Sequence, residues 1–381
     1  MGEYLRRAFP GHRNRRILAQ IGERLASNPP ICCLEADTSS WVLGLIGHAI
    51  DYRIRLHFAH FPSGNLRLAR DGAWMVARLD DFISLLRASP SRFPGFAVTP
   101  FGDAPSGTAN WQHLSDEETE DGDVTIWKES DAAPDSGPSF SLACVMADAL
   151  HRNLETRKLK SACILEFFDL LDETVTALGA HARPLSPSEE RRLARCCLIL
   201  AVFESIRRSG RAQLPEFLEV NVPGDAEGLL GAVPQPWADD VAELAISFRH
   251  RHADWHGTEA VLNPEFEGSR DVGGADGDLV VNGCLWDLKT TLKKRAEGTW
   301  LYQLLGYVLL DYEDRHAIDH VGLQFPRQAA SVHWPLQELA DELSGTPDVS
   351  IAAMRQEIRD LLRNPPPASR PPATSEPIAE H

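Results

Sequence analysis

The sequence predicts an α/β protein, a small mixed sheet flanked by helices with a larger helical region upstream. Two observations predict this fold class. Between residues 141 and 249 apolar residues recur mostly at helical spacing, whereas from residue 259 short apolar runs alternate with turn residues. A further helical segment then separates two of these runs, as expected where strands are joined across a helix-covered sheet.

The composition is that of a globular protein, with 43% hydrophobic and 24% charged residues in 381. The formal net charge of −17 argues against a protein that coats nucleic acid, because neutralising phosphates needs surplus Lys and Arg. An enzyme that meets nucleic acid through one local patch is still compatible. No apolar run is long enough for a bilayer and no secretory signal is present, so we expect no membrane association. Seven cysteines without framework spacing indicate buried free thiols and a cytoplasmic protein.

The first 230 residues divide into three parts. Residues 1–100 form an N-terminal mixed region with a helical pattern over 41–59, and residues 101–140, rich in Gly, Pro, Ser and acids, are expected to form an acidic flexible loop. Residues 141–230 are expected to form a helical subdomain. In it, Ser186 and Glu189 fit a capping box around Pro187 at the first helical position, and Gly210 fits a helix stop.

The remaining chain is expected to hold the sheet. Residues 231–345 form the predicted core, and residues 346–381 a last helix to about residue 363 and a disordered Pro-rich tail. The elements expected in the core are a helix at 237–249, strands at 259–266, 278–281 and 284–289, a helix at 299–311 and a strand at 318–325.

A predicted hairpin carries the candidate chemistry. Asn282-Gly283 between two apolar runs is a strong hairpin signal, because both turn residues tolerate positive φ. A two-residue loop there sets Asp278 opposite Asp287, where Cβ atoms of cross-strand neighbours are about 4.5–5.5 Å apart. Strand alternation then puts Lys289 on the face of Asp287. Two carboxylates and one ammonium therefore share a face.

Facing carboxylates repel unless a cation lies between them, and Mg²⁺ or Mn²⁺ is held by such groups. A metal ion, a positioned water and a nearby ammonium are what hydrolysis of a phosphodiester needs. The alternative interpretation is a surface hairpin whose charges face water.

The downstream helix favours the first interpretation, because Gln303 and Tyr307 are four residues apart and share one of its faces. Over residues 255–330 the chain resembles the PD-(D/E)XK nuclease superfamily, particularly its RecB-like branch. The resemblance rests on Asp278-Leu-Val-Val, Asp287-Leu-Lys289 and Gln303-Leu-Leu-Gly-Tyr307, in this order. It implies a restriction-endonuclease-like fold, metal ligands Asp278 and Asp287, catalytic Lys289, and Gln303 and Tyr307 beside the nucleic-acid backbone.

This family often adds an acid or a His from a helix before the core strands. Glu243 and Glu265 lie near the predicted strands, and Gly47-His48-Ala49-Ile50-Asp51 resembles the Gly-x-x-x-acid/His turn of the first helix. If Asp51 is that acid, residues 60–230 are an insertion; if it is not, it is an ordinary helix residue paired with Arg55. No cysteine follows Cys284, so the iron–sulfur cluster of some RecB-like nucleases is excluded.

The resulting hypothesis is a Mg²⁺- or Mn²⁺-dependent nuclease, with DNA expected over RNA, acting in repair or in defence against foreign DNA. One alternative is a catalytically inactive nuclease fold that binds nucleic acid or a protein partner. Another is a structural adaptor whose acidic loop and helical region contact other proteins or a second copy of the chain. Metal-dependent stability separates the last from the first.

Overall fold

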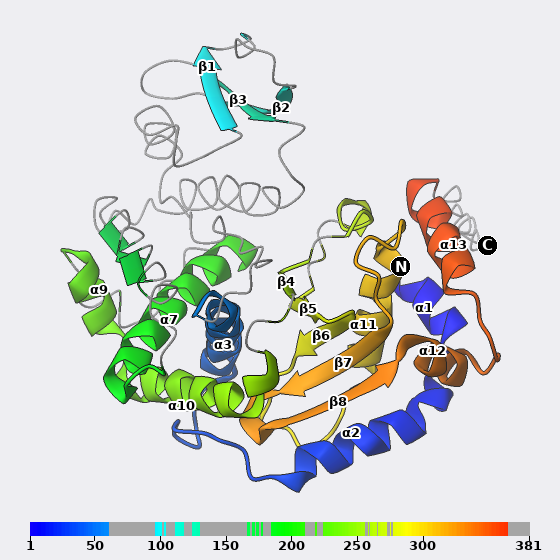
Figure 1. Ribbon diagram of the computed structural model, residues 1–381, viewed down its shortest axis with the longest axis horizontal. Coiled ribbons are helices and arrows are strands. Elements are labelled where there is room, and N and C mark those ends of the chain that lie inside the picture. Colours follow the sequence, from blue (N-terminus) through cyan, green and yellow to red (C-terminus); the bar gives the residue numbers. More distant parts are fainter. Residues whose placement is uncertain are drawn as a thin grey trace, which may run out of the picture.

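The structure is a computed structural model, drawn as a ribbon in Figure 1. It describes residues 1–60, 96–100, 103, 111–117, 124–129, 166–167, 170–171, 173–174, 177, 184–209, 218, 224–255, 258, 260–264, 266–272, 275 and 277–364. Among these residues, no helix combines the length and the apolar character that crossing a membrane requires.

A five-stranded mixed sheet organises the C-terminal half, which confirms the predicted α/β class. Its strands lie in the order β4-β5-β6-β7-β8, and only the β6–β7 pair is parallel. The strands are β4 (Ala260–Leu262), β5 (Leu279–Val281), β6 (Cys284–Leu288), β7 (His320–Phe325) and β8 (Ala330–Pro335). The parallel pair requires a crossover, which is made by helix α11 (Gly298–Leu310).

The β5–β6 hairpin has the predicted register. Asn282 and Gly283 have φ values of 50° and 76°, as a tight two-residue turn of this kind requires. Val281 pairs with Cys284 and Leu279 with Trp286. A shift of the pairing by one residue would place every side chain of one strand on the opposite face of the sheet. The observed register therefore determines which side chains are cross-strand neighbours.

Each face of the sheet is covered by helices, visible on either side of it in Figure 1. One face is covered by α3 (Ser40–His60), α7 (Pro187–Ser209) and α10 (Gln235–Arg251), and its strand side chains include Leu279 and Trp286. The other face contributes Val280 and Leu285. It is covered by α1 (Gly2–Ala8), α2 (Arg15–Ser27), α11, α12 (Leu336–Ser344) and α13 (Ile351–Arg363).

The helices from both ends of the chain therefore complete the core around the sheet. Neither the predicted boundary at residue 231 nor that at 346 separates independent cores, since α2, α3 and α13 all bury apolar residues in these two clusters. The remaining short elements are α9 (Ala226–Ala232) and the 3₁₀ helices η1 (Gly11–Asn14), η5 (Ala253–Trp255), η6 (Arg270–Val272) and η7 (Pro326–Gln328).

The capping box of α7 is confirmed. Glu189 N–H donates to Ser186 Oγ at 3.3 Å, and Ser186 N–H donates to Glu189 Oε2 at 2.7 Å. These reciprocal bonds satisfy two donors that the helix start would leave unpaired. The helix stop expected at residue 210 lies outside the described residues.

The prediction of a flexible loop over 101–140 is wrong for two stretches. Strands β2 (Trp111–Glu117) and β3 (Val124–Glu129) pair antiparallel, and β1 (Phe96–Pro100) pairs with β3. The abundance of acids and glycine between the strands concealed the run Val-Thr-Ile-Trp, whose β-branched and aromatic residues favour a strand. Most of the remaining 101–140 and 141–183 lies outside the described residues, as does the tail after residue 364.

Three smaller expectations also need correction. Strand β4 ends at Leu262, not residue 266, because Asn263 adopts a left-handed φ of 51°. Helix α13 begins at Ile351, not near residue 346, because the N–H groups of Asp348 and Val349 bond to the Asp341 side chain instead. Among the cysteines that the structure describes all are unpaired, but Cys32 and Cys33 are exposed, whereas Cys196, Cys197 and Cys284 are buried as expected.

Candidate active site

The two predicted carboxylates meet at one end of the β5–β6 hairpin. Asp278 immediately precedes β5, and Asp287 lies near the end of β6 with 1% of its surface exposed. The backbone N–H of Leu288 donates to Asp278 Oδ2 at 2.5 Å, so the Asp278 carboxylate reaches across to the residue next to Asp287. The hairpin register therefore brings the two acids together as predicted.

Lys289 joins this pair to helix α11. Its Nζ lies 2.6 Å from Asp287 Oδ2 and donates to Gln303 Oε1 at 2.8 Å. Gln303 Nε2 in turn donates to the Tyr307 hydroxyl at 2.7 Å. One continuous row of polar contacts thus runs from the buried Asp287 to Gln303, which is exposed and available to a ligand.

A third acid comes from helix α3. Asp51 is close enough for its charge to raise the pKa of Asp287, and it forms an ion pair with Arg55 one turn further along the helix. The helix lies against the end of β6, since a Cβ built on Gly47 would come 3.9 Å from Thr290 Cβ. The predicted pairing of Asp51 with Arg55 is therefore confirmed, and Asp51 also lies near enough to the hairpin acids to affect their charge.

The acids disfavour one another's charge. Loss of water around the carboxyl group, and then the charge of Asp287, raise the pKa of Asp278 to about 7 from an ordinary 3.8. Burial likewise raises the pKa of Asp287, against the opposing effect of Lys289. Lys289 and Arg55 both lower the pKa of Asp278. The site is thus an electronegative cluster that its two neighbouring cations neutralise only in part.

A buried ionic triad holds α3 in position. Glu190 of α7 is fully buried and accepts from Arg53 Nε at 2.5 Å and from Arg53 Nη2 at 3.0 Å through its two oxygens. It also accepts from Arg249 of α10 at 3.3 Å. Three helices therefore share one carboxylate, and removing one partner of such a buried group is costly. Arg53 lies two residues from both Asp51 and Arg55, so the triad fixes the segment of α3 that faces the site.

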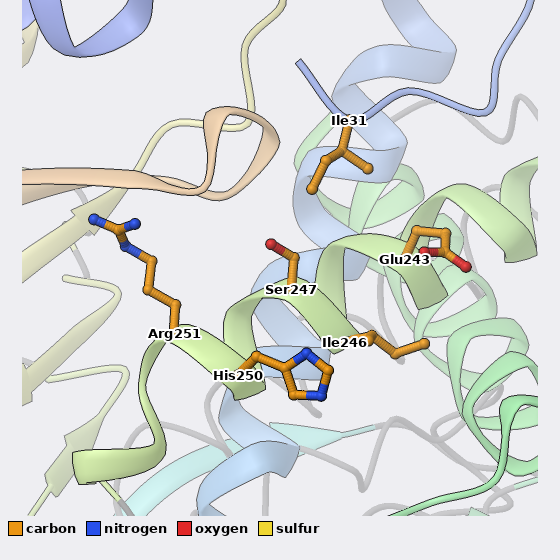
Figure 2. A pocket seen from close by; sticks show the side chains of 6 residues that line it. All are labelled: Ile31, Glu243, Ile246, Ser247, His250 and Arg251. Atoms are coloured by element: carbon orange, nitrogen blue, oxygen red, sulfur yellow. The ribbon is translucent and has the colours of Figure 1, made fainter. Parts of the chain in front are cut away.

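Glu243, another candidate acid, does not join the cluster. Glu243 of α10 lines a separate shallow pocket with Ile31, Ser247 and His250 (Figure 2). Its charge acts on Cys33, not on the hairpin acids. The proposal of Glu243 as an additional acid is therefore not supported by its position, because its helix directs it to that pocket. Glu265 lies outside the described residues.

The cluster offers hard oxygen donors of the kind that Mg²⁺ and Mn²⁺ prefer. Within the described part of the chain, however, no three His, Cys, Asp or Glu side chains are spaced as a ready-made metal site. Two of the oxygens are engaged, one by Lys289 and one by the Leu288 N–H. Apart from the Lys289 ammonium, no hydrogen-bond donor in the described residues satisfies the buried Asp287 Oδ2. The donor atoms are of the chemical kind that suits a divalent ion, and binding one would require Lys289 and the Leu288 N–H to release these oxygens.

Sequence reasoning did not select Arg55 as a site residue. The available signal was its position four residues after Asp51, which places the two on one helix face. Scans against known protein families, curated proteins and solved structures each returned no match for this chain. The interpretation of the site therefore rests on its own geometry.

Proposed function

We propose that this chain is a Mg²⁺- or Mn²⁺-dependent nuclease of the PD-(D/E)XK type that hydrolyses phosphodiester bonds, with DNA as the expected substrate. The observation that carries the proposal is the row of contacts from Asp287 through Lys289 and Gln303 to Tyr307. These residues lie on a strand and on the following helix, and a surface hairpin with solvated charges has no need of such a row. The row joins the residues of the acid-x-Lys and Gln-x-x-x-Tyr motifs.

The arrangement of elements supports a restriction-endonuclease-like fold. A helix (α3) that precedes the core strands supplies an acid, an antiparallel hairpin supplies two more, and the crossover helix α11 supplies Gln303 and Tyr307. If this proposal is right, the nuclease domain is discontinuous, and the residues between α3 and the region of α10 are inserted into it.

Each side chain has a definite task in this proposal. Asp278 and Asp287, assisted by Asp51, would hold the divalent ion, which supplies Lewis acidity and lowers the pKa of a water molecule. Lys289, which is paired with Asp287 in the metal-free protein, would orient a water molecule once the ion replaces it at that carboxylate. Gln303 offers amide groups to a phosphate oxygen or sugar, and Tyr307 keeps Gln303 in place through its hydroxyl. Stacking of the Tyr307 ring on Phe266 at 5.6 Å limits the motion of that hydroxyl.

A second candidate function is a nuclease fold that binds nucleic acid or a protein without cutting. It is favoured by the engagement of Asp287 with Lys289 and by the lack of a preformed three-ligand set among the described residues. Either protein would act in a reducing cytoplasm, since the described cysteines are unpaired. DNA repair and defence against foreign DNA are the two roles that suit the cutting enzyme.

Incubating the purified chain with end-labelled DNA and Mn²⁺ tests the proposal. Cleavage is expected for the wild type and for Lys293→Ala, whose exposed ammonium pairs with Glu297 and not with the acids. Lys289→Ala and Asp278→Asn should lose cleavage while remaining folded, as circular dichroism at the assay temperature would show. DNA binding without cleavage by every variant would select the second candidate, and neither binding nor cleavage would reject both.

A further inference from the structure

Arg55 occupies a place in the site that the motifs do not explain. It lies on the same face of α3 as Asp51 and is largely shielded, with 21% of its side chain exposed. Its charge reaches Asp278, whereas Lys289 contacts Asp287. Helix α3 and helix α11 cover opposite faces of the sheet. The acid pair therefore has two neighbouring cations: Arg55 of α3, and Lys289, which is hydrogen-bonded to Gln303 of α11.

The guanidinium of Arg55 is held from two directions. Asp51 accepts from its Nη2, and the Tyr52 ring lies beneath it, with Arg55 Cζ 5.3 Å from the ring centroid. Tyr52 itself is buried, with 6% exposure, so this support is rigid. A guanidinium fixed in this way loses little conformational freedom on binding, and its planar fork matches two oxygens of a phosphate.

The charges of the cluster also suit a phosphate. A divalent ion would hold all three carboxylates (Asp51, Asp278 and Asp287) in their ionised form beside the two cations Arg55 and Lys289. The cluster with its ion would then carry one net positive charge, which balances the single negative charge of a phosphodiester.

We propose that Arg55 is a substrate-binding residue that grips a phosphate of the cleaved strand, on the side of the acid pair opposite Gln303. The inference rests on the proposed nuclease function and adds a residue to it. In the free enzyme the ion pair with Asp51 keeps the Arg55 guanidinium in place. When nucleic acid binds, the guanidinium rotates and donates hydrogen bonds to two phosphate oxygens. Gln303 and Arg55 then hold the backbone from two helices.

Two measurements on the same variants test the inference. The first is the affinity for a short labelled duplex, followed by fluorescence anisotropy in Ca²⁺ over a range of salt. Arg55→Gln should weaken binding about tenfold and lower the slope of log affinity against log salt by about one, as the loss of one phosphate contact requires. Arg55→Lys keeps the positive charge but loses the bidentate hydrogen bonding of the guanidinium. Its salt dependence should therefore be closer to that of wild type than its affinity for the duplex is.

The second measurement is Mn²⁺ affinity without DNA, followed by the shift in melting temperature. Arg55→Gln removes a cation beside the acids and should bind Mn²⁺ at least as tightly as wild type, whereas Asp278→Asn should bind it weakly. Arg192→Gln is the matched control, because Arg192 makes its ion pair with Glu227 of α9. It should match wild type in both measurements. If Arg55→Gln unfolds, Arg55→Met, which keeps the apolar length of the side chain and leaves Asp51 in place, replaces it.

The outcomes separate the two claims. If the wild type binds and cuts DNA but Arg55→Gln keeps the wild-type affinity and salt slope, the role of Arg55 is wrong and the nuclease proposal stands. If Arg55→Gln loses Mn²⁺ affinity as Asp278→Asn does, Arg55 builds the acid cluster and does not grip phosphate. A wild type that neither binds nor cuts DNA overturns the nuclease proposal, and the role of Arg55 with it.

Discussion

The raised pKa of Asp278 makes the stability of the metal-free protein depend on pH in an unusual direction. A carboxyl group that holds its proton more tightly in the folded chain than in the unfolded chain favours folding at low pH. Between the unfolded value of 3.8 and the folded value of about 7, the folded state binds the extra proton. The free energy of unfolding contributed by Asp278 therefore falls as pH rises through this window.

The size of the effect follows from the same two values. They differ by about three pH units, and each is worth about 1.36 kcal/mol, so the contribution lost is on the order of 4 kcal/mol. His252 acts in the opposite sense: burial lowers its pKa to about 4 from 6.5, so its contribution to stability rises with pH. Wild type must therefore be compared with Asp278→Asn, in which His252 is unchanged and the amide cannot ionise.

Urea unfolding at several pH values between 4 and 8, in the presence of EDTA, measures the difference. Subtracting the Asp278→Asn free energy from that of wild type should leave a curve that falls by a few kcal/mol toward pH 7. Asp37→Asn provides a control: because Asp37 is exposed, the free energy of unfolding of this variant should vary with pH as that of wild type does. Saturating Mn²⁺ should cancel the fall in wild type alone. Parallel wild-type and Asp278→Asn curves would refute the electrostatic account of the site.

Other parts of the structure give further expectations. Glu190→Gln leaves Arg53 and Arg249 buried without their shared charge and should lower the free energy of unfolding by about 3–5 kcal/mol; an unchanged urea midpoint would contradict the triad's role. Ser186→Ala should cost about 1 kcal/mol by the same assay, since it removes the α7 cap. Gln303→Ala should raise KM for DNA more than it lowers kcat, and a selective loss of kcat would speak against a positioning role.

The sequence was sufficient for features fixed by near neighbours along the chain. The Asn282-Gly283 turn determines the register within a few residues, and the register determines that Asp278 meets Asp287. The α7 capping box is likewise local. The spacing of Gln303 and Tyr307 placed them on one helix face, and the observed hydrogen bond between them follows from that spacing.

Features that depend on long-range packing could not be chosen from the sequence. Asp51 and Asp287 are separated by more than half of the chain. The Gly47–Asp51 motif favoured Asp51, but the sequence alone could not exclude Glu243, which is also an acid on a helix before the core strands. The choice between them is made by the Arg53–Glu190–Arg249 triad, which aligns α3 with the sheet. The strands β2 and β3 were missed because acidic residues and glycine dominate the sequence around them.

Anomalous diffraction from crystals soaked in Mn²⁺ tests the central claim most directly, because it locates the ion without requiring turnover. The account predicts one strong anomalous peak between the carboxylates of Asp278 and Asp287, with Lys289 withdrawn from Asp287, and no such peak in Asp287→Asn crystals. The absence of a peak there at millimolar Mn²⁺, with Lys289 still bound to Asp287, would contradict it.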